Sequence, residues 1–178
     1  MNEESQNLLR YADRTDKSFG LAGMAISLMV WDAEGSLNHI DLDASPEEAL
    51  RMTPDFYLSP VASAKAVWDN NLRRFQLSSA MLVANVVCRS MVHLNRQVIP
   101  STLDDAMRAA VIDEGEALCQ LEAEEAVRIY SKAFAYCHRL FSHPEVARLA
   151  AGLSDELCRH GRMGAHEIFD MLAPLNRL

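Results

Sequence analysis

The chain has 178 residues, of which 49% are hydrophobic and 24% are charged. This composition excludes a wholly disordered chain, and the length favours a single domain whose core needs neither metals nor disulfides. The net charge of -8 and the pI near 5.2 argue against nucleic acid or an anionic membrane as a partner, because phosphates attract basic surfaces. Four widely spaced cysteines, with no Cys-x-x-Cys pair, predict reduced thiols and a cytoplasmic location.

The first part of the chain carries only weak helix signals. Residues 3–13 predict a short helix, and another is expected over residues 46–52, where Ser45 and Glu48 have the spacing of a capping box. The N-terminus lacks the basic region of a secretory signal. We therefore expect no export signal in this part of the chain.

The stretch from Phe19 to Trp31 fits two structures. Its apolar residues have helical spacing, but the turn residues 32–36 that follow also suit a small β-hairpin near 24–43, with residues 36–43 as the return strand. We favour the helix, because a two-stranded hairpin is only marginally stable without covering elements. In either case residues 32–36 form a turn.

A long helix is expected to begin at Ser59-Pro60 and to end before Pro100. Between Leu77 and Leu94 nearly all of its faces are apolar, which places the helix at the centre of the fold or in a subunit interface. Polar residues interrupt this stretch, so we interpret it as buried in protein and not in lipid. The candidate interface residues are Met81, Val87, Met91 and Leu94.

The rest of the chain predicts two more long helices. Helical spacing runs from residue 101 to 141, with one candidate break at Gly115, and a capped helix follows from Ser142 to Gly161. A short helix is expected over 164–172. The fold class is therefore all-α: an antiparallel bundle of three long helices, with shorter helices at both ends.

We expect one helical domain over residues 1–178. In this arrangement residues 1–58 form an irregular N-terminal layer, and residues 59–178 form the core of the bundle. The small β-hairpin near 24–43 stays open as an alternative within the N-terminal layer.

Candidate metal ligands gather near the C-terminus. Cys158, His160 and His166 flank the turn at Gly161 and could converge on a soft metal. The structural alternative is that Cys158 packs in the core while His160 binds carbonyls at the end of a helix. The Glu-x-x-His spacing of di-iron bundles does not occur in the sequence, and we expect no cofactor.

Four polar residues are candidates for a ligand pocket between helices. Arg89 and His93 lie four residues apart on the apolar helix, and Glu114 and Glu125 share the apolar face of the next one. A buried charge needs a partner, so structural ion pairs with neighbouring arginines are the alternative interpretation.

Two functions follow from these patterns. The first is a non-enzymatic helical protein that acts through protein–protein interaction, with self-association as a homodimer; the apolar helix and nine methionines favour it. The alternative is a small-molecule or metal-binding enzyme with a pocket between the helices. The sequence has no nucleophile elbow, phosphate loop or zinc-peptidase pattern, so we favour the first.

Overall fold

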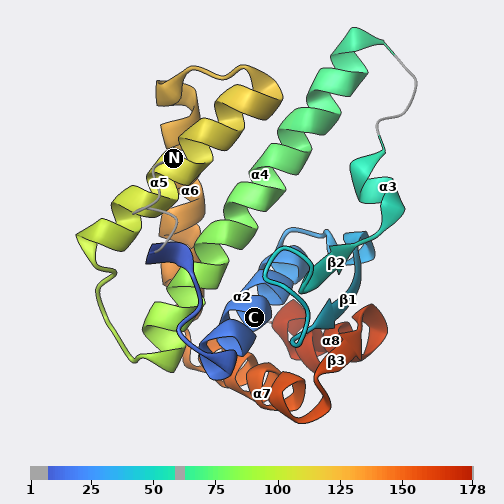
Figure 1. Cartoon of the computed structure of the whole chain (residues 1–178), viewed down its shortest axis with the longest axis vertical. Helices are drawn as coiled ribbons and strands as arrows, with labels where there is room; N and C mark the ends of the chain where they lie inside the picture. The colour runs from blue at the N-terminus through green and yellow to red at the C-terminus, as the bar shows by residue number, and fades with distance from the viewer. Residues whose placement is uncertain (1–7, 59–62, 178) are drawn as a thin grey trace.

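The computed structural model describes residues 8–58 and 63–177, which form a mainly helical protein, as predicted. Its main helices are α2 (Arg14–Val30), α3 (Pro54–Tyr57), α4 (Ala64–Cys88), α5 (Ser101–Cys119), α6 (Ala123–Phe141), α7 (Pro144–His160) and α8 (Ala165–Leu172). A small antiparallel sheet contains β1 (Leu37–Asp41), β2 (Leu50–Met52) and β3 (Arg162–Gly164). Figure 1 shows α2, α7, α8 and the sheet gathered at one end, with α5 and α6 alongside α4.

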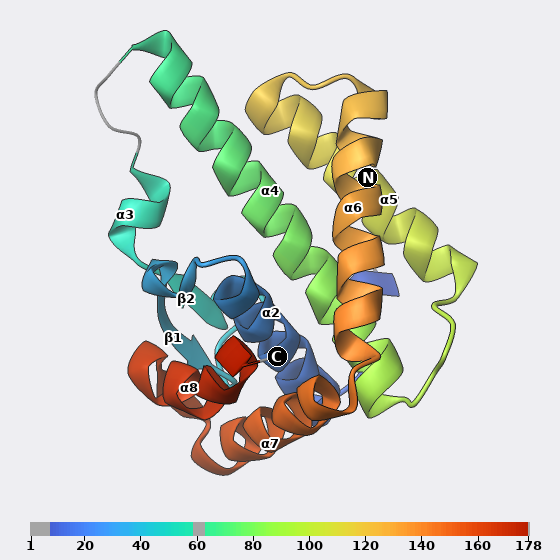
Figure 2. The same cartoon turned by 180° about the vertical axis from the view of Figure 1, so that it is seen from behind.

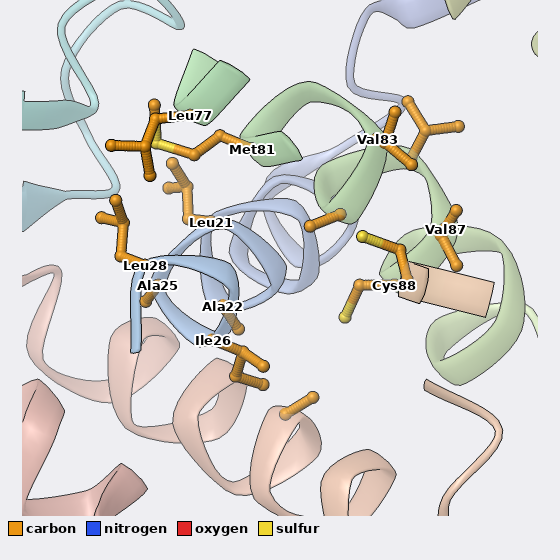
Figure 3. Packing of buried hydrophobic residues seen from close by; sticks show 14 of the residues in the cluster. Leu21, Ala22, Ala25, Ile26, Leu28, Leu77, Met81, Val83, Val87 and Cys88 are labelled. Atoms are coloured by element: carbon orange, nitrogen blue, oxygen red, sulfur yellow. The ribbon is translucent and has the colours of Figure 1, made fainter. Parts of the chain in front are cut away.

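Helix α2 lies at the centre of the fold, packed against both α4 and α7. Figure 3 shows Leu21 directed toward Leu77 and Met81 of α4, while Ile26 points to the opposite side. A Cβ on Gly23 would lie 2.5 Å from the Ala84 carbonyl oxygen, so the backbones of α2 and α4 approach closely. The predicted irregular N-terminal layer therefore contains the central helix, and residue 58 does not mark the edge of the core.

The helix favoured over residues 19–31 is confirmed, and the hairpin near 24–43 is wrong because residues 24–30 belong to α2. Its proposed return strand does form, as β1, but its partners come later in the chain: β2 on one side and β3 on the other. The helix expected over 46–52 is also wrong, since β2 occupies the end of that segment.

Helix α4 extends from an exposed end into the core. No residue of α4 before Phe75 is buried, whereas most residues from Phe75 to Cys88 are. Figures 1 and 2 show the first half of α4 reaching away from α2, α7 and the sheet. Ser63 caps the helix by accepting a hydrogen bond from the Ala66 amide, and the expected start at Ser59-Pro60 lies outside the described residues.

The apolar stretch of this helix is buried mainly by protein. In the described part of the chain, one helical segment, Ala64–His93, is long and apolar enough to cross a membrane. Inside the fold, 72% of its most apolar window is buried. The helix continues beyond Cys88 as a π-helical turn, Arg89–His93, in which the Leu94 amide donates to the Arg89 carbonyl at 3.0 Å. Single π-turns of this kind often occur at functional sites.

The run over 101–141 forms two helices that pack side by side, α5 and α6, and not one helix. The break is at Gln120, whose left-handed φ of 54° ends α5, and not at Gly115. Gly115 is instead a packing residue, because a Cβ there would lie 2.8 Å from Cζ of Phe75. The three long helices expected between residues 59 and 161 are therefore four, α4, α5, α6 and α7, and α2, with 17 residues, is as long as α7.

The predicted end of the chain is largely confirmed. Helix α7 ends at Gly161, which adopts a φ of 72°, and α8 matches the short helix expected over 164–172. The strand β3 between them was not predicted. The predicted cap at Ser142 is wrong, because His143 is the N-cap and the Ser142 hydroxyl donates back to the His138 carbonyl at 2.7 Å.

Candidate functional site

Arg89 lies buried at the start of the π-turn and pairs with Asp16 of α2. Its Nε donates to Asp16 Oδ1 at 2.8 Å, and its Nη2 donates to Asp16 Oδ2 at 2.6 Å. The other donors reach the carbonyl oxygens of Leu9 at 3.1 Å and Arg10 at 2.7 Å, and Oδ1 of Asn85 at 3.4 Å. A guanidinium has five N–H donors, and Arg89 makes these five hydrogen bonds. Every donor of Arg89 therefore has an acceptor within the chain. Arg89 therefore ties residues 9–16 to α4 and has no free donor for a ligand.

The groups around this ion pair complete a polar network. Burial acts to raise the pKa of Asp16, but hydrogen bonds from Arg89 and the Ala12 amide outweigh it, so the pKa lies below its ordinary value. The Tyr11 ring centroid lies 5.0 Å from the Arg89 guanidinium carbon, and the Tyr11 hydroxyl accepts from Asn85 Nδ2 at 2.7 Å. Such a saturated network fits a structural role.

His93 lies at the other end of the π-turn and stacks on Phe19, with ring centroids 4.7 Å apart and an interplanar angle of 23°. His93 and Arg89 line the same cavity of about 320 Å³, together with Leu8 and Leu94. The structure thus brings two of the four predicted ligand residues together. It leaves them little to offer a ligand, because Arg89 is saturated and Phe19 covers one face of the His93 ring.

The two predicted acids lie elsewhere. Glu114 is half-buried and accepts a hydrogen bond from the Ser78 hydroxyl; burial raises its pKa, and this bond and the nearby Arg74 charge partly offset the rise. Glu125 is exposed, and its carboxylate accepts from the Glu122 amide at 3.1 Å as part of the capping box of α6. The four predicted residues therefore do not converge on one pocket.

The three candidate metal ligands bind separate partners. The Cys158 thiol donates to the Ser18 hydroxyl at 3.3 Å, whereas His160 pairs with Glu156 and His166 with Asp170. The described residues contain no group of three His, Cys, Asp or Glu side chains that could hold a metal ion. Cys158 thus packs partly against the core, as in the alternative interpretation, whereas His160 pairs with the Glu156 carboxylate and not with carbonyls at the helix end.

The four candidate interface residues divide between core and surface. Met81 and Val87 are buried within the single chain, so neither is available to a partner. Met91 is partly buried against the core, and Leu94 is 47% exposed. The apolar half of α4 is therefore part of the core. An interface with a partner has to lie on other surfaces of the chain.

A groove between α4 and α6 is the site that sequence reasoning missed. It has a volume of about 460 Å³ and is lined by the aromatic rings of Trp31 and Tyr136, by aliphatic side chains and by the cations Arg73 and Lys132. On α6, Lys132 and Tyr136 are four residues apart and share one helix face. That spacing is visible in the sequence, but the facing residues of α2 and α4 are not.

No family model, no curated protein and no solved structure matches this chain.

Proposed function

We propose that this protein is non-enzymatic and acts through protein–protein interaction, in its simplest form by pairing as a homodimer. The observation that supports the proposal best is the exposure of Trp68, at 46%, on the half of α4 that extends from the core. Further exposed apolar side chains are Tyr57 of α3, Leu58 directly after it and Leu118 near the end of α5. We call the part of α4 before Phe75, which carries Trp68, the α4 end.

Helix physics supports a partner for the α4 end. A short helical segment is marginally stable in water without tertiary packing, and no residue of α4 before Phe75 is fully buried, although Leu72 packs partly against the core. A second copy packed against this segment would cover Trp68 in both chains, as a two-fold interface requires. Tryptophan is also the residue type most enriched among the energetic centres of interfaces.

The buried reactive groups support a non-enzymatic role. Arg89 is saturated by acceptors within the chain, and the acid Glu114 is bound by Ser78. Burial raises the pKa of the Cys137 thiol to about 12, and it also raises the pKa of Cys88, so both thiols are neutral and weakly nucleophilic. The alternative of an enzyme that uses Arg89, His93, Glu114 and Glu125 together has no shared pocket to support it.

Light scattering after size-exclusion chromatography tests the proposal. We expect a mass of twice the 19.9 kDa of one chain, and a folded single chain for Trp68→Glu. Leu94→Glu is the matched control, because Leu94 is exposed to the same degree, 47%, on the π-turn end of the long helix. If Leu94→Glu loses the dimer and Trp68→Glu keeps it, the interface lies at the π-turn end. A single-chain mass for the unchanged protein would contradict self-association.

The cytoplasmic location and the exclusion of nucleic-acid and membrane partners stay predictions from the net charge and the cysteines.

A further inference from the structure

The groove between α4 and α6 has one apolar, aromatic part. Trp31, at the end of α2, and Tyr136 of α6 have ring centroids 5.4 Å apart at an interplanar angle of 31°. Ala80 and Ala133 line the groove beside them and leave room between the helices, because their side chains are small. At about 460 Å³ the groove falls in the range of small-molecule sites.

Two cations line the other part of the groove. Helices α4 and α6 run in the same direction, from the α4 end toward the π-turn end (Figure 2). At 1.5 Å per residue, Arg73 lies about 10 Å before Ala80 on α4, and Lys132 about 6 Å before Tyr136 on α6. Arg73 therefore precedes Ala80 on one wall of the groove, and Lys132 precedes Tyr136 on the other.

These cations are available for a ligand. In the described part of the chain neither Arg73 nor Lys132 has a hydrogen bond or an ion pair, whereas other surface cations such as Lys65 and Arg148 pair with neighbouring acids. The described residues that line the groove include no acid. The groove thus combines apolar side chains, the amide of Gln76 and two cations without an ion pair among the described residues, in a chain of net charge -8.

We propose that the groove binds a small amphipathic anion, whose apolar body lies against Trp31 and Tyr136 and whose single acid group lies between Arg73 and Lys132. A medium-length alkyl carboxylate fits the length of the groove, because Arg73 and Ala80, which both line it, are about 10 Å apart along α4. Burial of the alkyl chain supplies affinity, and charge-assisted hydrogen bonds to the two cations select the acid over a neutral headgroup. Arg73 lies on the same half of α4 as Trp68 of the proposed dimer surface, but their spacing of five residues places the two side chains about 140° apart around the helix.

Calorimetric titration with octanoate and octan-1-ol tests the proposal, because the two probes differ chiefly in the charged headgroup. We expect octanoate to bind at least about tenfold more tightly than octan-1-ol, a difference of about 1.4 kcal/mol, since hydrogen bonds to charged groups contribute at least that much. Arg73→Gln and Lys132→Gln should each weaken octanoate by about tenfold and leave octan-1-ol unchanged. Lys65→Gln, which removes an exposed cation of α4 outside the groove, should change neither.

Fluorescence locates the bound probe. The chain has two tryptophans, so Trp68→Phe leaves Trp31 as the single reporter, and octanoate should change its emission. Equal affinity for the two probes, no binding of octanoate, or binding without a change at Trp31 would overturn the proposal. If octanoate fails to bind and Arg73→Gln instead breaks a dimer, the groove holds an acidic part of a second copy. Loss of the dimer in Trp68→Glu with unchanged octanoate binding would separate this site from the dimer surface.

Discussion

At the scale of single residues, the buried Arg89–Asp16 pair joins the start of α2 to the π-turn. Arg89→Gln leaves the Asp16 carboxylate buried without its countercharge, so we expect the free energy of unfolding in urea to fall by about 3 to 5 kcal/mol. Arg148→Gln is the control, since Arg148 and Glu145 form an exposed pair whose loss should hardly change the free energy of unfolding. Similar losses in both variants would contradict a structural role for Arg89.

Glu114 predicts a pH dependence of opposite sign to that of an ordinary paired acid. Burial raises its pKa in the folded state, so the folded chain binds more protons than the unfolded one as the pH rises from the ordinary carboxyl value to the raised value. The free energy of unfolding therefore falls across this window. Glu114→Gln removes that fall. The free energy of unfolding of the variant minus that of the unchanged protein should therefore be larger at pH 7 than at about pH 4. An equal difference at the two pH values in urea titrations would show that Glu114 does not titrate in this way.

At the scale of elements, two glycines inside helices make a matched pair. A Cβ on Gly115 of α5 would lie 2.8 Å from Phe75 and 3.2 Å from Ala126, whereas a Cβ on Gly152 of α7 meets nothing within 4 Å. We expect Gly115→Ala to lower the free energy of unfolding by about 1 to 3 kcal/mol through overpacking. Gly152→Ala should raise it by about 0.5 to 1 kcal/mol, because alanine favours the helix. Thermal unfolding of the two variants shows whether each substitution lowers or raises stability. Stabilisation by Gly115→Ala would show that α4 and α5 are not packed this closely.

The elements that the sequence predicted are those with local signals. Helices α7 and α8 follow from apolar spacing, and the end of α7 follows from Gly161. The sheet could not be predicted, because β1 pairs with β3 across about 120 residues of chain and β3 has only three residues. The break at Gln120 was missed because a left-handed residue other than glycine leaves little trace in sequence.

At the scale of the whole molecule, the candidate site was predictable only in part. The sequence identifies Arg89 and His93 as unusual polar residues on an apolar helix, but the acid that binds Arg89 is Asp16, 73 residues earlier. Likewise, helical spacing shows that residues 77–94 are apolar, but it does not show whether another chain or the same chain covers them. Met81 and Val87 are covered by α2 and the rest of the same chain's core. For the exposed Trp68 we infer that a second copy covers it.

Hydrogen exchange of the α4 backbone, measured at low and high protein concentration, tests this account most directly. We predict that amides 67–74 exchange faster in dilute solution and become protected as the concentration rises, because a second copy then covers the α4 end. Amides 77–88 should be protected at both concentrations, since α2 and the rest of the core already bury them. Equal exchange of amides 67–74 at all concentrations would contradict the proposed pairing through Trp68.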